Sequence, residues 1–151
     1  MTGGEKRAND VPAPRFTHLA VLVRHLEDAG KVFCDRLGLA PQALESLPSE
    51  GVRVMFIPIG LGAIELIEPL ATNDPLQRFL AARGGAVHHV AIEVPDLDAA
   101  VVRARCAGFG LIGDAPRRGA HGTRVMFVHP RSTHGVLIEL VEKSSDRHLE
   151  P

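Results

Sequence analysis

Hydrophobic and polar positions alternate over several short stretches of the chain, the pattern of strands with one buried face. Apolar positions with a helical period lie between these stretches, and residues that start or stop helices flank them. Gly38 follows the first helical stretch, Gly84 follows the second, and Asp96 precedes the third as an N-cap. The pattern predicts strands over 16–23, 40–47, 51–59, 62–67, 87–94, 109–113, 124–129 and 136–142, and helices over 26–37, 74–84 and 96–107.

These elements occur in the order βαβββ twice, and the sequence itself repeats. His18-Leu19-Ala20-Val21 matches His89-Val90-Ala91-Ile92, and residues 51–56 match 122–127, both at an offset of 71 residues. Residues 64–68 match 138–142 at an offset of 74. We therefore predict one α+β domain over 16–143, made of two tandem βαβββ modules at 16–70 and 87–142 with a linking helix at 74–84. Residues 1–15 are predicted to be a disordered tail, and residues 144–151 a second tail.

Each module carries one histidine and one glutamate at matching places. Successive strand residues face opposite sides, so strands that pack apolar residues on the helices turn these polar residues to the other face. The four residues that share this face are His18, Glu65, His89 and Glu139. A fold of two similar halves can bring all four together on its pseudo-two-fold axis, and two imidazoles with two carboxylates would form a metal site.

A single histidine or glutamate is more often structural or solvated than a ligand, but the repetition of all four positions favours the metal interpretation. His88 is the rival of His89; the repeat places it on the opposite strand face, as a structural residue or a hydrogen-bond donor behind the ligand. The donor set suits Co²⁺, Ni²⁺, Mn²⁺, Zn²⁺ or Fe²⁺ and leaves two positions of an octahedron open. Structural zinc sites are typically closed and rich in cysteine, and the chain has no such cluster.

Composition limits the other classes of function. With 151 residues and 45% hydrophobic content, the chain fits a single soluble domain, and its net charge of −1 argues against nucleic-acid binding. No apolar run is long enough to cross a membrane, and residues 1–14 have no hydrophobic signal segment. Cys34 and Cys106 are expected to be reduced thiols, so we predict a cytoplasmic protein.

With the repeat and the four polar residues, the chain resembles the vicinal oxygen chelate superfamily and, within it, the methylmalonyl-CoA epimerases. The resemblance covers about residues 16–143. It is carried by residues 18–21 (HLAV), 64–70 (IELIEPL), 88–94 (HHVAIEV), 119–122 (GAHG), 129–132 (HPRS) and 135–140 (GVLIEL). The outer histidine and glutamate are superfamily-wide, whereas the HHVA, GAHG and HP segments together indicate the epimerase branch.

The resemblance implies a curved mixed sheet that forms a cup, with helices on its outer face. It implies interconversion of (2R)- and (2S)-methylmalonyl-CoA, by removal and return of the C2 proton through a metal-stabilised enolate. One divalent ion, with Co²⁺ favoured, would be held by His18, Glu65, His89 and Glu139. Glu139 and Glu65 would act as the two bases. A homodimer is expected, with no membrane or nucleic-acid partner.

The sequence departs from part of that family at two positions. Some epimerases have glutamine in place of Glu65 and a glutamate in place of Val54, which cannot take a proton. We therefore expect Glu65 to serve as both ligand and second base, or Glu50 to substitute for it. The resemblance further implies substrate contacts from His121, Gly122 and Arg131. Arg117, Arg118 and Arg131 are candidates to bind the phosphates of coenzyme A, although each also fits a plain solvated loop residue.

Three other functions are open on the same fold. Glyoxalase I uses the same His/Glu/His/Glu set on a glutathione hemithioacetal, and Glu65 suits it, but the GAHG and HP segments weigh against it. A ring-cleaving dioxygenase would use two histidines and one glutamate on Fe²⁺, and Glu65 would crowd a position that it needs open. A drug-binding protein of this fold would commonly lack the metal ligands.

Overall fold

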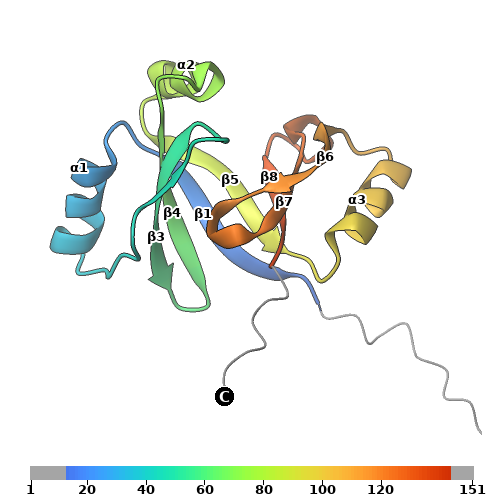
Figure 1. The fold of residues 1–151 in the computed structure, drawn as a ribbon, viewed down its shortest axis with the longest axis horizontal. Helices are drawn as coiled ribbons and strands as arrows, with labels where there is room; N and C mark the ends of the chain where they lie inside the picture. The colour runs from blue at the N-terminus through green and yellow to red at the C-terminus, as the bar shows by residue number, and fades with distance from the viewer. Residues whose placement is uncertain (1–12, 144–151) are drawn as a thin grey trace, which may run out of the picture.

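The computed structural model describes residues 13–143, and the strands of this part form a single curled sheet (Figure 1). Its order is β2-β3-β4-β1-β5-β8-β7-β6. The strands are β1 (Arg15–Leu22), β2 (Glu45–Leu47), β3 (Val52–Ile59), β4 (Gly62–Pro69), β5 (Ala86–Glu93), β6 (Leu111–Arg118), β7 (Arg124–Val128) and β8 (Ile138–Glu142). The sheet is mixed, as expected, because β1–β4 and β5–β8 are parallel pairs and the other neighbours are antiparallel.

The helices match the predicted positions. Helix α1 (Leu26–Gly30) continues into a π-helical turn (Lys31–Arg36), and α2 (Asp74–Arg83) and α3 (Leu97–Cys106) follow. The side chain of Asn73 caps α2, whose C-terminus is followed by Gly84, and the side chain of Asp96 accepts from the N–H of Ala99 to cap α3. No helix of the described residues is long and apolar enough to cross a membrane.

The two modules meet at the centre of the sheet, where β1 and β5 pair antiparallel. In this pairing His18 lies opposite Ala91, and Ala20 lies opposite His89, so the register has the two-fold symmetry that the repeat predicts. Within the modules, Ala20 pairs with Glu65 on β4, and Ala91 pairs with Glu139 on β8. The predicted α+β fold of two tandem modules is therefore confirmed.

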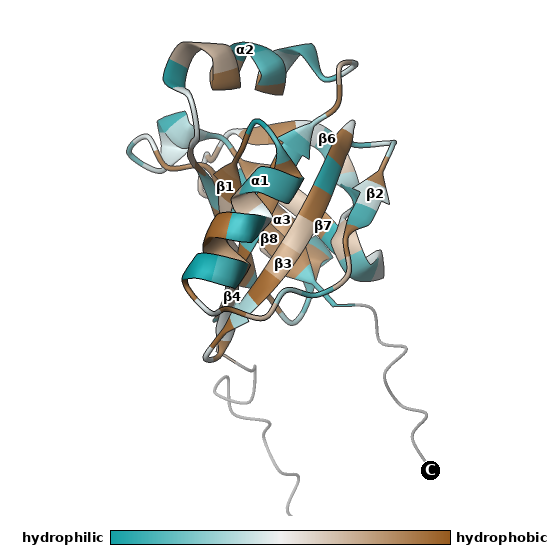
Figure 2. Ribbon diagram, turned by 90° about the vertical axis from the view of Figure 1, so that its left-hand side faces the viewer, coloured by the Kyte–Doolittle hydropathy of each residue, from teal (hydrophilic) through white to brown (hydrophobic). Residues whose placement is uncertain are grey.

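The outer face of the sheet is covered by two of the helices. Leu26 of α1 packs on Ile57 and Leu66, and Figure 2 shows α1 lying in front of β3 and β4, where β3 is largely hydrophobic. On the other module, Leu97 of α3 packs with Met126. Helix α2 differs, because its Leu80 joins residues of the inner face, including Leu22 and Val52. Helix α2 thus closes one end of the cup.

In each module, one glutamate joins the covering helix to the sheet through two contacts. The Glu68 carboxylate accepts the backbone N–H of Leu26 at the start of α1, at 2.6 Å, and pairs with Arg53 at 3.2 Å. Anions are favoured at helix N-termini, so this contact stabilises the junction. In the second module the same contacts are made by Glu142, Leu97 and Arg124.

Two predicted strands differ from the structure in extent. The strand expected over 40–47 is formed only by Glu45–Leu47; residues 40–44 have no regular structure, and Leu44 is exposed. The strand expected over 109–113 runs instead from Leu111 to Arg118, with a register shift between Ile112 and Arg117 that interrupts the alternation. The predicted tails lie outside the described residues except for 13–15, and Arg15 already belongs to β1.

Candidate metal centre

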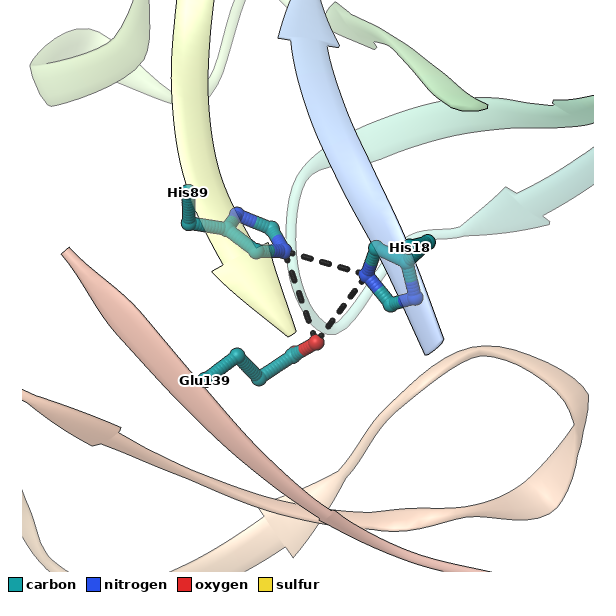
Figure 3. A group of neighbouring side chains, drawn as sticks. All are labelled: His18, His89 and Glu139. Atoms are coloured by element: carbon teal, nitrogen blue, oxygen red, sulfur yellow. Dashed lines mark hydrogen bonds and ion pairs between the residues drawn. The ribbon is translucent and has the colours of Figure 1, made fainter. Parts of the chain in front are cut away.

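Four side chains converge on one point inside the cup. His18 on β1, Glu65 on β4, His89 on β5 and Glu139 on β8 are each less than one-tenth exposed. His18 Nε2 lies 3.2 Å from Glu65 Oε2, 3.2 Å from Glu139 Oε2 and 3.2 Å from His89 Nε2. His89 Nε2 lies 3.6 Å from Glu65 Oε2 and 3.4 Å from Glu139 Oε2. Figure 3 shows three of these side chains pointing at one another from separate strands.

This geometry fits a divalent ion. Nitrogen and oxygen ligands lie about 2.1 Å from such ions, so neighbouring ligand atoms are about 3.0–3.4 Å apart. The separations of 3.2–3.6 Å between these ligand atoms fall close to that range. Burying two carboxylates is costly unless positive charge compensates them, and a divalent ion supplies that charge. His18, His89 and Glu139 alone already form a buried three-residue group able to hold a metal.

Protonation of the metal-free cluster reflects the same need for positive charge. Burial alone would lower the pKa of His18, but hydrogen bonds and charge from Glu139 and Glu65 outweigh it and raise the pKa to about 9. Burial alone would raise the pKa of Glu139, but its hydrogen bonds to His18 and His89 lower it to about 2. Without a metal, a proton on His18 therefore occupies the centre at neutral pH.

Two phenylalanines hold the histidine rings edge-on. The Phe56 ring lies 5.4 Å from that of His18 at 86°, and the Phe127 ring lies 5.2 Å from that of His89, also at 86°. Phe56 and Phe127 occupy matching positions of the repeat and lie opposite the two glutamates in the sheet register. We did not predict this role, although the 71-residue offset contained the signal.

The sequence predicts His88 on the opposite face of the sheet from His89. This prediction is wrong, because the two side chains lie beside each other. Its Nδ1 is 2.9 Å from His89 Nδ1, and its ring packs edge-on against Phe79. A register shift in the β1–β5 pairing leaves His88 without a partner residue, which explains why simple alternation fails here. Burial and then the neighbouring His89 lower the pKa of His88 to about 4, so His88 is neutral.

Two cavities border the four-residue cluster. The larger, of about 680 Å³, reaches His18, and the smaller, of about 390 Å³, reaches His89. Both are lined by Glu65 and Glu139. The two carboxylates are thus accessible to a ligand in either cavity.

The predicted substrate contacts are distributed around these cavities. His121 lines the larger cavity, its ring centroid lies 4.6 Å from that of Phe56 with the two rings tilted at 46°, and its backbone N–H donates to the Glu45 carboxylate. Arg117 and Arg118 line the smaller cavity, and Arg117 Nε lies 2.9 Å from the Glu50 carboxylate. Arg131 is exposed on a 3₁₀ turn (Pro130–Ser132) and lines neither cavity.

The glycines of the GAHG segment serve the backbone of the loop. A Cβ on Gly119 would lie 2.7 Å from Val125 Cγ1, so only glycine permits this close approach to β7. Gly122 has a φ of +71°, a left-handed conformation that side chains other than hydrogen disfavour. These glycines shape the loop that carries His121 into the larger cavity.

Comparison with known proteins shows the family of the chain. Residues 17–127 match the model of the glyoxalase/bleomycin resistance protein/dioxygenase superfamily, and the chain belongs to that family. It is 39% identical to the mitochondrial methylmalonyl-CoA epimerase of Mus musculus over 127 residues, which cover 83% of this chain and 71% of that protein. It is 38% identical over 128 residues to the ethylmalonyl-CoA/methylmalonyl-CoA epimerase of Cereibacter sphaeroides, covering 83% and 96%.

A solved structure extends the likeness to the fold. A variant of Streptomyces coelicolor methylmalonyl-CoA epimerase, in complex with 2-nitronate-propionyl-CoA, superposes with a TM-score of 0.82 at 31% identity. The superposition covers 87% of this chain and 98% of that one. The superfamily membership and the fold that the sequence predicted are therefore confirmed.

Proposed function

We propose that this protein is a metal-dependent methylmalonyl-CoA epimerase, which interconverts the (2R) and (2S) thioesters by moving the proton at C2. The observation that carries the proposal is the cluster of His18, Glu65, His89 and Glu139, buried between two cavities in a chain whose relatives are named epimerases. The alternative of glyoxalase I is not favoured, because these relatives and the structural neighbour are epimerases of acyl-CoA.

The bound ion would supply positive charge that stabilises the negative charge developing on the thioester oxygen when C2 loses its proton. The chain itself supplies the proton transfer. Glu139 lines both cavities, so its carboxylate can face a substrate held in either one. Glu65 is its repeat partner on the other module, so the two carboxylates can approach a planar intermediate from different sides.

The smaller cavity is the better place for the reacting acyl group. Val54 lies in its wall, at the position where some epimerases carry a glutamate base. The same wall contains Glu50, our alternative second base, but Arg117 holds that carboxylate in an ion pair. We therefore favour Glu65 as the second base and give Arg117 a role in binding the anionic substrate, through the guanidinium nitrogens that remain.

The remaining assignments extend this proposal. His121 would contact the substrate from the larger cavity, Gly122 would do so from the turn that follows His121, and Arg131 would reach the coenzyme A phosphates from outside both cavities. Co²⁺ is the first ion to test, followed by Mn²⁺, Ni²⁺, Zn²⁺ and Fe²⁺. A homodimer and a cytoplasmic location stay predictions; sedimentation of the full chain and its localisation in cells test them.

The decisive experiment is deuterium wash-in at C2. The protein is freed of metal by chelation, reloaded with Co²⁺, and incubated in D₂O with one epimer of methylmalonyl-CoA. We expect deuterium incorporation together with equilibration of the two epimers, measured by mass spectrometry and chiral analysis. No exchange with any of the five ions would overturn the proposal. Isomerisation of the methylglyoxal–glutathione adduct in a parallel assay would instead support glyoxalase I.

A further inference from the structure

The Nδ1 atoms of both metal-site histidines face the residue that precedes them in the chain. Thr17 Oγ1 lies 3.2 Å from His18 Nδ1, and His88 Nδ1 lies 2.9 Å from His89 Nδ1. Thr17 and His88 are themselves separated by the repeat offset of 71 residues. The two modules therefore repeat the neighbour of each histidine as well as the histidine.

A backbone irregularity explains how adjacent strand residues meet. Side chains at neighbouring positions of a regular strand point to opposite faces. In the β1–β5 ladder, Phe16 pairs with Ile92 and His18 with Ala91, which leaves Thr17 as an extra residue of β1. Ala20 then pairs with His89 and Val21 with Val87, which leaves His88 as an extra residue of β5. Bulges of this kind re-aim side chains next to functional sites.

The chemistry of imidazole determines what these neighbours do. A histidine that binds a metal through Nε2 needs that nitrogen free of hydrogen, so its Nδ1 carries the proton and requires an acceptor. The threonine hydroxyl oxygen can accept from His18 Nδ1–H. His88 can accept at its own Nδ1 only as the neutral tautomer with hydrogen on Nε2.

We propose that Thr17 and His88 are positioning residues, which accept the Nδ1–H of His18 and His89 from two repeat-matched bulges and so aim both Nε2 atoms at the metal. This inference rests on the metal centre of the proposed function. In this proposal His88 is an acceptor, whereas the sequence had suggested a structural residue or a hydrogen-bond donor. It also gives a physical reason for the two consecutive histidines: His89 lies in the cluster, and His88 accepts the hydrogen bond that orients it.

The test uses matched pairs of variants of the full chain. Thr17→Val removes the acceptor at nearly constant volume, and Thr17→Ser keeps it. His88→Leu removes the second acceptor, and His88→Asn keeps an oxygen close to the position of Nδ1. The affinity of each protein for Co²⁺ is measured by competition with a chelator. The Nδ1–H signals of His18 and His89 are followed by ¹H–¹⁵N NMR in the Zn²⁺-loaded proteins.

We expect Thr17→Val and His88→Leu to bind Co²⁺ about 10–100-fold more weakly, while Thr17→Ser and His88→Asn stay within about threefold of the unmodified protein. The Nδ1–H signal of the affected histidine should exchange faster with solvent only in the variants that lack the acceptor. Equal affinities within each pair would overturn the inference, as would losses that merely follow the melting temperatures of the metal-free proteins.

The proposed epimerisation and the proposed positioning role of Thr17 and His88 can be refuted independently. If the unmodified protein binds Co²⁺ and the pairs differ as expected but no epimerisation occurs, the proposed reaction is wrong and the positioning role stands. If epimerisation occurs and the pairs do not differ, the positioning role is wrong. A chain that binds none of the five divalent ions would overturn both.

Discussion

Metal binding at this centre should release protons in a way that the structure specifies. In the metal-free protein at pH 7, His18 is protonated because its pKa is about 9, and Glu139 is ionised because its pKa is about 2. A metal can bind His18 Nε2 only after the proton has left. The number of protons released by His18 at pH 7 is therefore about one, since a group with a pKa two units higher is about 99% protonated.

The same linkage sets the pH dependence of affinity. The apparent Kd for Co²⁺ should fall about tenfold per pH unit between about pH 7 and pH 9, and level off above pH 9 when His18 is already neutral. Calorimetric titration in two buffers of different ionisation enthalpy measures the proton number, and chelator competition across the pH range measures the slope.

A variant supplies the control for this reasoning. Glu139→Gln removes a negative charge that raises the pKa of His18, so fewer protons should be released at pH 7 and the affinity should level off at a lower pH than in the unmodified protein. The affinity itself should fall, because a ligand oxygen loses its charge. Release of no proton at pH 7 by the unmodified protein would show that His18 is not protonated in the metal-free cluster.

Four further outcomes are expected. In the metal-free protein, the raised pKa of His18 means that its protonated form stabilises the fold below about pH 6.5, and this stabilisation is lost as the pH rises through about 9. The lowered pKa of Glu139 means that its ionised form stabilises the fold above about pH 4.5, and this stabilisation is lost as the pH falls towards 2. Denaturant titrations at several pH values should show both declines, and a flat profile would contradict the assigned charges. Glu65→Gln should keep bound Co²⁺ but lower kcat by at least about 10²-fold; full epimerisation with metal retained would exclude Glu65 as a base. Arg117→Ala should raise KM about tenfold with little change in kcat if its charge binds the anionic substrate; an unchanged KM would exclude Arg117 from substrate binding. Gly119→Ala should lower the free energy of unfolding by about 1–3 kcal/mol, because its φ of −108° suits any residue but its Cβ would lie 2.7 Å from Val125 Cγ1; an unchanged free energy of unfolding would contradict this close approach.

The doubled pattern also explains which contacts are shared by the modules and which are not. The contact of Glu68 with the N-terminus of α1 recurs between Glu142 and α3, and each of these glutamates lies three residues after a metal-site glutamate on the same strand. The surroundings of the two cavities differ. Arg117 and Glu50 border only the smaller cavity, and His121 borders only the larger one. An asymmetric substrate requires this difference between the two sides of a nearly symmetric centre.

The sequence by itself determined the two modules, the helices and the four polar residues that share the inner face. These features depend on local periodicity and on the repeat, both of which can be read along one chain. Their agreement with the structure extends to the register, since Ala20–Glu65 and Ala91–Glu139 are matching pairs. The short strand at Glu45–Leu47 and the irregular β6 were less visible, because exposure and a register shift weaken the alternation there.

Only the tertiary structure decided how the ligands are supported. Alternation places Thr17 and His88 on the face away from their histidines, and a bulge in the pairing of two distant strands reverses this. A bulge depends on which residues of the partner strand are bonded, so no pattern within one strand reveals it. The same holds for the contact of Arg117 with Glu50, which joins the edge regions of different modules. Such contacts exist only once both halves of the sheet are closed around the metal centre.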